Sequence, residues 1–301
     1  MNESNDIAQA SPQATAPESA APASGRDPRL DSLRGLAMVA VVVGHVILGA
    51  FHGIGNAPYG FQFAFTVLTS FHVQLFAFIS GYLTKPPQSV GDGVGAIGRR
   101  ALQLLLPFAA WTTVFWLAGG RPLGLGSMLT ALAGGTPPMW FLMALFVVSL
   151  FFYLFSWNET LLVVLTCLIA LWPAAVPGFC VIQAERLVPF FVAGHLAKKH
   201  GWKTGWWTAP LYLAGMWAIW SSAGANLLFP TPLWTDAFNA WASDVWWLGG
   251  SVLVRTLRVA VPLCGIGALF LAGRRWTPLQ GWGTRSLGVY AAHQLVLRLF
   301  A

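Results

Sequence analysis

Apolar runs separated by short polar segments occupy most of this chain. Nine runs are long enough for membrane helices, because crossing the hydrocarbon of a bilayer takes about 20 predominantly apolar residues. They cover residues 30–51, 63–83, 101–118, 138–156, 160–176, 179–198, 206–224, 248–272 and 285–301. A shorter apolar piece, Leu123–Ala133, suggests a re-entrant or interfacial helix, and an extra crossing there or near 225–247 raises the count to ten. The pattern therefore predicts an all-α, polytopic membrane helix bundle of nine to ten transmembrane helices.

The composition supports the same class. Hydrophobic residues make up 56% of the 301 positions and charged residues only 9%, whereas about a quarter of the residues in a water-soluble domain are charged. This balance excludes a soluble globular protein. The formal net charge is +7, but the basic residues are scattered between the apolar runs and do not gather into a patch. We therefore expect the lipid bilayer, and no nucleic acid, as the partner of these charges.

The distribution of Lys and Arg predicts the orientation. If the N-terminus is cytoplasmic, the inner loops hold twelve of the 17 basic residues, and the outer side holds only Arg121 and Arg298. Such an excess on one side is the positive-inside pattern, so we expect a multi-pass protein of a bacterial inner (cytoplasmic) membrane with a cytoplasmic N-terminus. Residues 1–25 are rich in Ala, Pro and Ser and are predicted to be a disordered tail, and residues 26–301 to form the transmembrane domain.

The first apolar run carries two ionisable residues in unusual places. Arg34 and His45 are eleven residues apart, which in a helix places them within about 20° of one another and roughly 16 Å apart along the axis. Arg34 is near the cytoplasmic interface, where its side chain reaches water, whereas His45 lies deep in the hydrocarbon. His45 must therefore face the interior of the bundle or a wet cavity. Asp31 and Ser32 are the expected caps of this helix.

Two further ionisable residues are expected at a similar depth. His72 lies near the middle of the second run, and Glu185 is an acidic residue well inside the sixth. A carboxylate can orient an imidazole and raise its basicity, so His45, His72 and Glu185 together suggest a general-base cluster that takes a proton from a hydroxyl. The same residue types also suit a proton relay of the kind used in transport. His293, in the last run, is interpreted as a structural residue.

Three arginines also fall inside apolar runs: Arg186, Arg255 and Arg258. An intramembrane arginine costs at least about 2.5 kcal/mol at mid-helix, so we expect these side chains to face inward and to have partners. Because Glu185 is the one carboxylate among them, positive charge is in excess. This surplus suits an anionic, phosphorylated ligand, which guanidinium groups bind in bidentate geometry. The alternative is that Arg255 and Arg258 cap carbonyl groups or reach water in a cavity.

Five short motifs resemble those of the membrane-bound acyltransferase 3 family, in the family's order and over nearly all of residues 26–301. The first is LDSLRGLA at 30–37 followed by His45, which matches the family's pattern of an arginine, ten residues and a histidine. The second, FHVQLFAFISGYL at 71–83, is similar to the fucose 4-O-acetylase branch. The others are WFL at 140–142, VPFFVAG at 188–194 and SLGVYAAH at 286–293.

The resemblance implies an acyltransferase that moves an acetyl or other short acyl group from cytoplasmic acetyl-CoA to a hydroxyl of a carbohydrate, such as a cell-surface polysaccharide precursor. It implies His45 as the catalytic histidine. Acyl-CoA and the carbohydrate acceptor are then substrates, and we expect no tightly bound cofactor and no metal.

Basic residues are the expected contacts for the phosphates of the acyl donor. They are Arg34 in the first run and the pair Arg99-Arg100 before the third, with Arg255 and Arg258 inside the eighth. A pantetheine arm lying along the first helix would carry the thioester from Arg34 toward the catalytic histidine, over a distance comparable to its extended length. Donor and acceptor would then meet inside the membrane.

Two chemical roles stay open for His45. It can act as general base on the acceptor hydroxyl, or as a nucleophile that forms an acetyl-imidazole. A tetrahedral oxyanion needs a hydrogen-bond donor, for which His72 or an inward arginine is a candidate. We expect His45, His72 and Glu185 to line one cavity that reaches the cytoplasm near Arg34. The alternative function is a proton-coupled transporter, or an exporter of a lipid-linked sugar, that uses the same polar residues as a relay.

Overall fold

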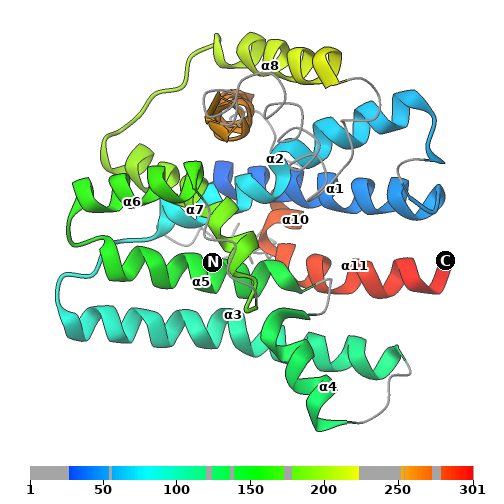
Figure 1. Cartoon of the computed structure of the whole chain (residues 1–301), viewed down its shortest axis with the longest axis horizontal. Helices are drawn as coiled ribbons and strands as arrows, with labels where there is room; N and C mark the ends of the chain where they lie inside the picture. The colour runs from blue at the N-terminus through cyan, green and yellow to red at the C-terminus, as the bar shows by residue number, and fades with distance from the viewer. Residues whose placement is uncertain are drawn as a thin grey trace, which may run out of the picture.

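The computed structural model describes residues 27–53, 56–119, 124–135, 139–172, 178–223, 252–253, 255–272 and 279–300. Every regular element within these residues is a helix (Figure 1). The prediction of an all-α protein is therefore confirmed for the described part of the chain. The predicted disordered tail at 1–25 and the segment near 225–247, considered for an extra crossing, lie outside the described residues.

Each of the nine apolar runs overlaps a helix. These helices are α1 (Pro28–Ala50), α2 (Tyr59–Leu83), α3 (Val90–Ala118), α5 (Trp140–Phe155), α6 (Glu159–Leu171), α7 (Val181–Lys199), α8 (Thr208–Ala223), the Arg255–Ala272 helix and α11 (Ser286–Phe300). Shorter elements are α4 (Leu125–Thr130), the π-helical turn η2 (Ala131–Gly135) and α10 (Gln280–Thr284). α4 and η2 occupy the place of the short helix expected at Leu123–Ala133.

Among the described residues, four helices are long and apolar enough to cross a bilayer: α1, α2, α3 and the Arg255–Ala272 helix. α5 and α6 are apolar but shorter, with 16 and 13 residues. At about 1.5 Å of rise per residue they measure about 24 and 20 Å, less than the roughly 30 Å thickness of the hydrocarbon. The chain is a membrane protein by the length and composition of its helices, and nine to ten crossings stays a prediction.

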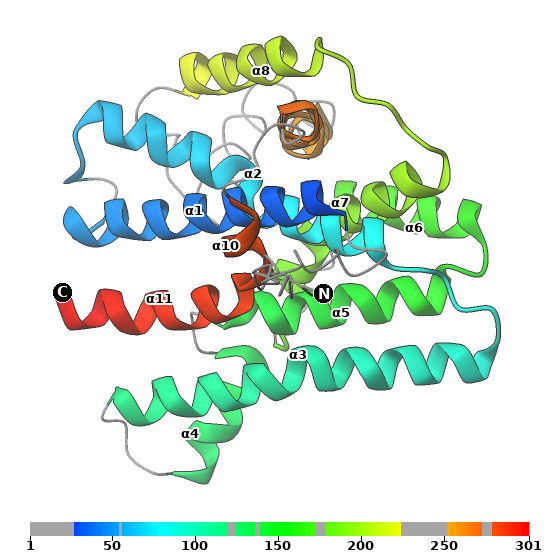
Figure 2. The same cartoon turned by 180° about the vertical axis from the view of Figure 1, so that it is seen from behind.

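Most of the helices lie side by side. In Figures 1 and 2, α1, α2, α3, α5 and α11 run broadly along one direction, with α1 in contact with α2, α10 and α11. The Arg255–Ala272 helix is seen end-on in both views, so it runs across the others. It packs on α8, where Tyr212 lies against Gly265. The sequence pattern predicts a crossing for this run, and the helix is long and apolar enough for one; the pattern predicts nothing about its direction relative to the other helices.

The start of α1 follows from local hydrogen bonding. Asp27 caps the helix by accepting a hydrogen bond from the backbone N–H of Arg29 at 2.9 Å. Pro28 occupies the first helical position, where no partner is needed for the missing N–H. Asp31 and Ser32, the expected caps, lie inside the first turns of the helix instead. The helix therefore begins about one turn before the position that the sequence pattern predicts.

α2 and α7 pack closely because two glycines face the partner's backbone. A Cβ atom added to Gly81 on α2 would collide with the carbonyl oxygen of Phe191, and one added to Gly194 on α7 would collide with that of Phe78. Only glycine allows both approaches. Small residues that let backbones touch are a typical basis of helix packing in lipid, where no hydrophobic force brings helices together.

The start of α1 is held against α10 in the same manner. A Cβ atom on Gly35 would collide with the carbonyl oxygen of Leu279, and one on Gly283 would collide with that of Asp31. α10 leads directly into α11, so this contact sets α11 beside α1. As a result α1 lies between α2 and α11, and residues on three helices can meet along it.

Candidate functional site

His45 lies on α1 and is half-buried. Its Nδ1 is hydrogen-bonded to the carbonyl oxygen of Val41, one turn earlier, at 2.8 Å. His72 on α2 is buried, with 8% of its surface exposed, and makes the same contact with the carbonyl oxygen of Leu68 at 2.8 Å. Each imidazole is therefore held by the backbone of its own helix.

These two contacts determine where the imidazole protons are. A carbonyl oxygen only accepts hydrogen bonds, so Nδ1 must carry a proton in both His45 and His72. In a neutral imidazole with Nδ1 protonated, Nε2 keeps its lone pair. Both side chains therefore carry a basic nitrogen on the side of the ring that their own helix does not occupy, as a general base requires.

A third histidine completes the cluster. The His293 ring on α11 meets the His45 ring edge to face, with ring centroids 5.0 Å apart, and the Tyr290 ring packs on His293 at 5.9 Å. His293 Nδ1 is also within 3.2 Å of a carbonyl oxygen of its own helix, that of Val289. We define the histidine cluster as His45 on α1 together with His72 and His293 on α2 and α11, the two helices that pack against α1. Within it, the rings of His45 and His293 are in contact.

The sequence pattern left His293 among the structural residues. The feature of the sequence that could have marked His293 as functional is its position inside an apolar helix, where an imidazole needs a polar partner. That partner, His45, is 248 residues away along the chain, so no local pattern reveals it. In the described residues, no group of three His, Cys, Asp or Glu side chains is arranged to hold a metal ion. The chemistry that this arrangement offers is proton transfer.

Glu185 is buried on α7, with 9% of its surface exposed. The sequence pattern predicts it as the carboxylate that orients a catalytic imidazole. In the structure the orienting acceptors of His45 and His72 are backbone carbonyls, which occupy the Nδ1 atoms that a carboxylate would bind. A catalytic role of Glu185 stays a prediction.

Arg34 follows the first turn of α1. Its Nη1 lies 3.3 Å from Oδ1 of Asp31, and the hydrogen bond joins residues three apart on one helix face. The Arg34 side chain is 27% exposed, whereas the Asp31 side chain is only 6% exposed. The guanidinium therefore links a buried carboxylate to the surface of the bundle. Phosphate binding by Arg34 stays a prediction.

The basic pair at the start of α3 is divided between two environments. Arg99 is exposed, whereas Arg100 is half-buried and donates from Nη2 to the hydroxyl of Thr84, just after α2, at 3.0 Å. The Thr84 carbonyl is in turn within 3.3 Å of Nδ1 of His195 on α7. Thr84 therefore connects α3 and α7 to the end of α2. The predicted contact of Arg99 and Arg100 with a ligand phosphate stays a prediction.

The arginines inside the apolar runs do not share one environment. Arg255 donates a hydrogen bond to the carbonyl oxygen of Leu171, the last residue of α6, and Arg258 is half-buried one turn further on. For Arg255 the structure therefore supports carbonyl capping, which is the alternative to phosphate binding. Arg186 is exposed, and its inward orientation stays a prediction.

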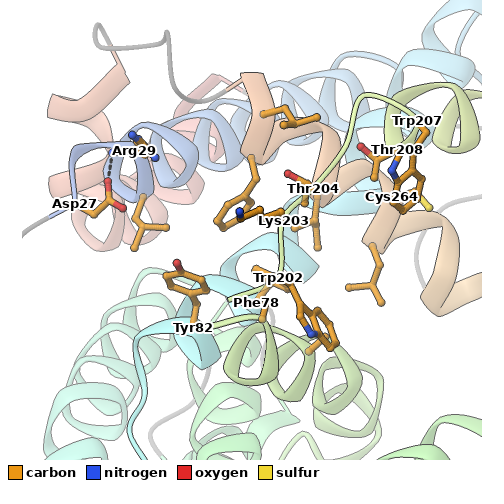
Figure 3. A pocket seen from close by; sticks show the side chains of 18 residues that line it. Asp27, Arg29, Phe78, Tyr82, Trp202, Lys203, Thr204, Trp207, Thr208 and Cys264 are labelled. Carbon is orange, nitrogen blue, oxygen red and sulfur yellow. Dashed lines mark hydrogen bonds between the residues drawn. The ribbon is translucent and has the colours of Figure 1, made fainter. Parts of the chain in front are cut away.

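A cavity of about 700 Å³ lies where α1 begins and where α2 and α7 end. Its other walls are the segment 202–208 and the Arg255–Ala272 helix (Figure 3). Its polar and aromatic lining includes Arg29, Tyr82, Trp202, Lys203, Trp207 and Thr208. His45, His72, Glu185 and Arg34 do not line it, so this cavity is not the single passage from Arg34 to His45 that the sequence pattern predicts.

Comparison with known proteins places the chain in a family. A family model described as an acyltransferase domain matches residues 27–301. Two similar proteins are each named Nodulation protein NolL. The one from Sinorhizobium fredii is 29% identical over 187 residues, 58% of this chain and 49% of the relative. The one from Mesorhizobium japonicum is 32% identical over 91 residues, 30% of this chain and 24% of the relative.

This chain therefore spans about half the length of the first relative and a smaller part of the second. No solved structure matches it. The family match extends from the cap of α1 to the end of the chain and includes all five motifs, among them the Arg34–His45 pair and the two glycines that join α2 to α7. The chain belongs to the acyltransferase 3 family.

Proposed function

We propose that this protein is an integral membrane O-acyltransferase that transfers an acetyl or other short acyl group from acyl-CoA to a hydroxyl of a carbohydrate. The observation that carries the proposal is the hydrogen bond from Nδ1 of His45 to the Val41 carbonyl, which leaves a basic Nε2 inside an apolar helix. Family membership supports acyl transfer. The resemblance of the motif at 71–83 to the fucose 4-O-acetylase branch supports a sugar hydroxyl as acceptor.

In the proposed reaction His45 is the general base. Its Nε2 takes the proton from the acceptor hydroxyl as that oxygen attacks the thioester carbonyl. The new C–O bond forms, the C–S bond of the donor breaks, and the CoA thiolate leaves with the proton that the imidazolium returns. An oxyanion donor must carry a hydrogen on the atom that faces the oxyanion. Nε2 of neutral His72 carries none, because the Nδ1–H of this ring is engaged by the Leu68 carbonyl, so an inward arginine is the proposed donor.

The experiment uses the purified chain in lipid nanodiscs with acetyl-CoA and a panel of oligosaccharides. Acceptor-dependent release of the CoA thiol and the acetyl ester on the sugar, detected by mass spectrometry, report transfer. His45→Ala is expected to lower the rate by about 10²- to 10⁴-fold, the usual contribution of a positioned general base. His200→Gln is the matched control, because His200 is an exposed histidine bonded to Glu159 after the end of α7. It is expected to leave the rate unchanged.

The same preparation separates the alternatives. A wild-type rate in His45→Ala would contradict the proposed role of His45. Proton flux into proteoliposomes in the presence of a lipid-linked sugar, with no acetyl ester formed, would favour the transporter. Labelled acetyl-CoA without acceptor distinguishes the two enzymatic roles: label retained on His45 indicates an acetyl-imidazole, and absence of label indicates a general base.

A further inference from the structure

The cavity where α1 begins has an excess of positive charge. Arg29 and Lys203 line it and are exposed. Its acidic residue, Asp27, is the cap of α1 and already accepts the N–H of Arg29. Lys198 adds a third cation, with Nζ 4.9 Å from the centre of the Tyr82 ring that forms part of the wall. Two lining cations against one lining carboxylate, with Lys198 near the wall, suit an anion, and guanidinium and ammonium groups are the usual ligands of phosphate.

The same cavity has flat aromatic walls. Trp202 and Trp207 line it with 57% and 51% of their surface exposed, and Figure 3 shows them on the segment that leads into α8. The Tyr82 ring packs on Phe270 at 6.0 Å. Exposed rings next to cations are the surfaces on which nucleic acid bases stack, because every base has a π-face. The combination of charge and rings points to a phosphorylated nucleoside.

Size and position agree with one end of a long ligand. About 700 Å³ lies within the usual range of roughly 300–1,000 Å³ for small-molecule pockets. The cavity is lined by Leu30 of α1, which is fifteen residues before His45, or about 22 Å along the helix. A ligand that binds here must therefore have a long arm to bring a reacting group to the histidine cluster.

We propose that this cavity binds the phosphorylated adenosine end of the acyl-CoA donor. Arg29 and Lys203 bind phosphate oxygens, and Trp202 or Trp207 stacks on the adenine. The pantetheine arm then extends along α1 to the histidine cluster. This proposal rests on the proposed function, and it assigns the anionic end of the donor to residues that the sequence pattern did not single out.

The chain carries its own reporter for this site. Cys264 lines the cavity and is half-buried, and Cys167 is exposed on α6, away from the lining. N-Ethylmaleimide modification of the full chain in nanodiscs, followed at each cysteine by mass spectrometry, measures access to both thiols. Adenosine 3′,5′-bisphosphate, which has no thiol of its own, is expected to slow modification of Cys264 about tenfold. Adenosine without phosphate is expected to have no effect at Cys264, and the rate at Cys167 serves as the internal control.

Charge reversal tests the two cations. Lys203→Glu and Arg29→Glu are each expected to abolish the protection of Cys264 and to raise the KM for acetyl-CoA about tenfold, with a smaller change in kcat. Lys85→Glu is the matched control, because Lys85 is an exposed cation after the end of α2 that does not line the cavity. Trp202→Ala keeps all charges and is expected to weaken the protection of Cys264 as well. It therefore still tests the site if a charge-reversed variant fails to fold.

The outcomes distinguish this proposal from the proposed function. If the wild-type chain transfers acyl groups and adenosine 3′,5′-bisphosphate does not protect Cys264, the cavity is not the donor site, although the enzyme assignment stands. Protection with no acyl transfer to any sugar would overturn the proposed function and leave a nucleotide site. A labelling rate that responds only to the anionic lipid content of the nanodisc would mean that these cations bind lipid phosphate, and would overturn the site.

Discussion

The imidazoles of His45 and His293 meet edge to face between α1 and α11, with ring centroids 5.0 Å apart and ring planes at 68°. The Tyr290 ring packs behind His293 at 5.9 Å, and His45 is also held by the Val41 carbonyl. His45 is therefore oriented from two sides, by its own helix and by α11. We propose His293 as a positioning residue for His45, because the contact that the structure shows for it is with the His45 imidazole.

His293→Ala is expected to lower kcat for acyl transfer by about two- to tenfold with KM unchanged, because an edge-to-face aromatic pair contributes about 0.5–1.5 kcal/mol. His293→Phe keeps the ring and is expected to restore most of the rate. The measurement is the kinetics of both variants in nanodiscs. A His293→Phe rate as low as that of His293→Ala would show that the imidazole nitrogens matter, and not the ring contact.

The α2–α7 contact predicts a large effect of very small substitutions. Gly81→Ala and Gly194→Ala each place a methyl group against a partner carbonyl, so each is expected to destabilise the fold by about 1–3 kcal/mol or more. Gly98→Ala on α3 is the control, because no atom lies within 4 Å of its added Cβ, and it should leave stability unchanged or raise it. Modification of the buried Cys180 thiol on heating, followed by mass spectrometry so that the exposed Cys167 is counted separately, reports unfolding. Equal melting temperatures for all three variants would contradict the close approach.

The Asp31–Arg34 pair predicts an energetic coupling inside α1. Asp31→Asn, Arg34→Gln and the double variant form a cycle whose coupling free energy is expected to be about 1 kcal/mol or more, because the carboxylate is only 6% exposed. The melting temperatures of the four proteins provide the measurement. If the changes in melting temperature of the two single variants add up to that of the double variant, the two side chains are not coupled. The Arg34 guanidinium would then not stabilise the fold through Asp31.

An exposed ion pair at the start of α6 predicts a weaker and pH-dependent effect. Hydrogen bonds first from Lys199 and then from His200 lower the pKa of Glu159 from its ordinary value of 4.5. A lowered carboxyl pKa contributes stability above the unfolded-state value, and that contribution is lost as the pH falls through the folded-state value. Glu159→Gln is therefore expected to cost at most about 1 kcal/mol near neutral pH, and less at high salt. The difference from wild type should vanish in acid well below pH 4.5. A difference in melting temperature that persists there would contradict this assignment.

The apolar runs alone located the nine longer helices to within a few residues, but not the short helix α10. A membrane helix satisfies its backbone hydrogen bonds within one continuous segment, so an uninterrupted apolar run is sufficient to identify it. The periodicity of α1 likewise determined that Arg34 and His45 share one face, because that geometry belongs to a single helix. Gly81 and Gly194 belong to two of the five sequence motifs. The motifs do not show that Gly81 faces the backbone of α7 and that Gly194 faces the backbone of α2.

Only the tertiary structure decided which helices are neighbours. It brought His293 to His45, placed Arg29 and Lys203 around one cavity, and turned the Arg255–Ala272 helix across the bundle. The physical reason is that lipid tails and partner helices are equally apolar, so composition does not separate a lipid-facing position from a packed one. On α3, Leu102 is 68% exposed and Leu104 is 8% exposed, and only packing distinguishes these two identical residues.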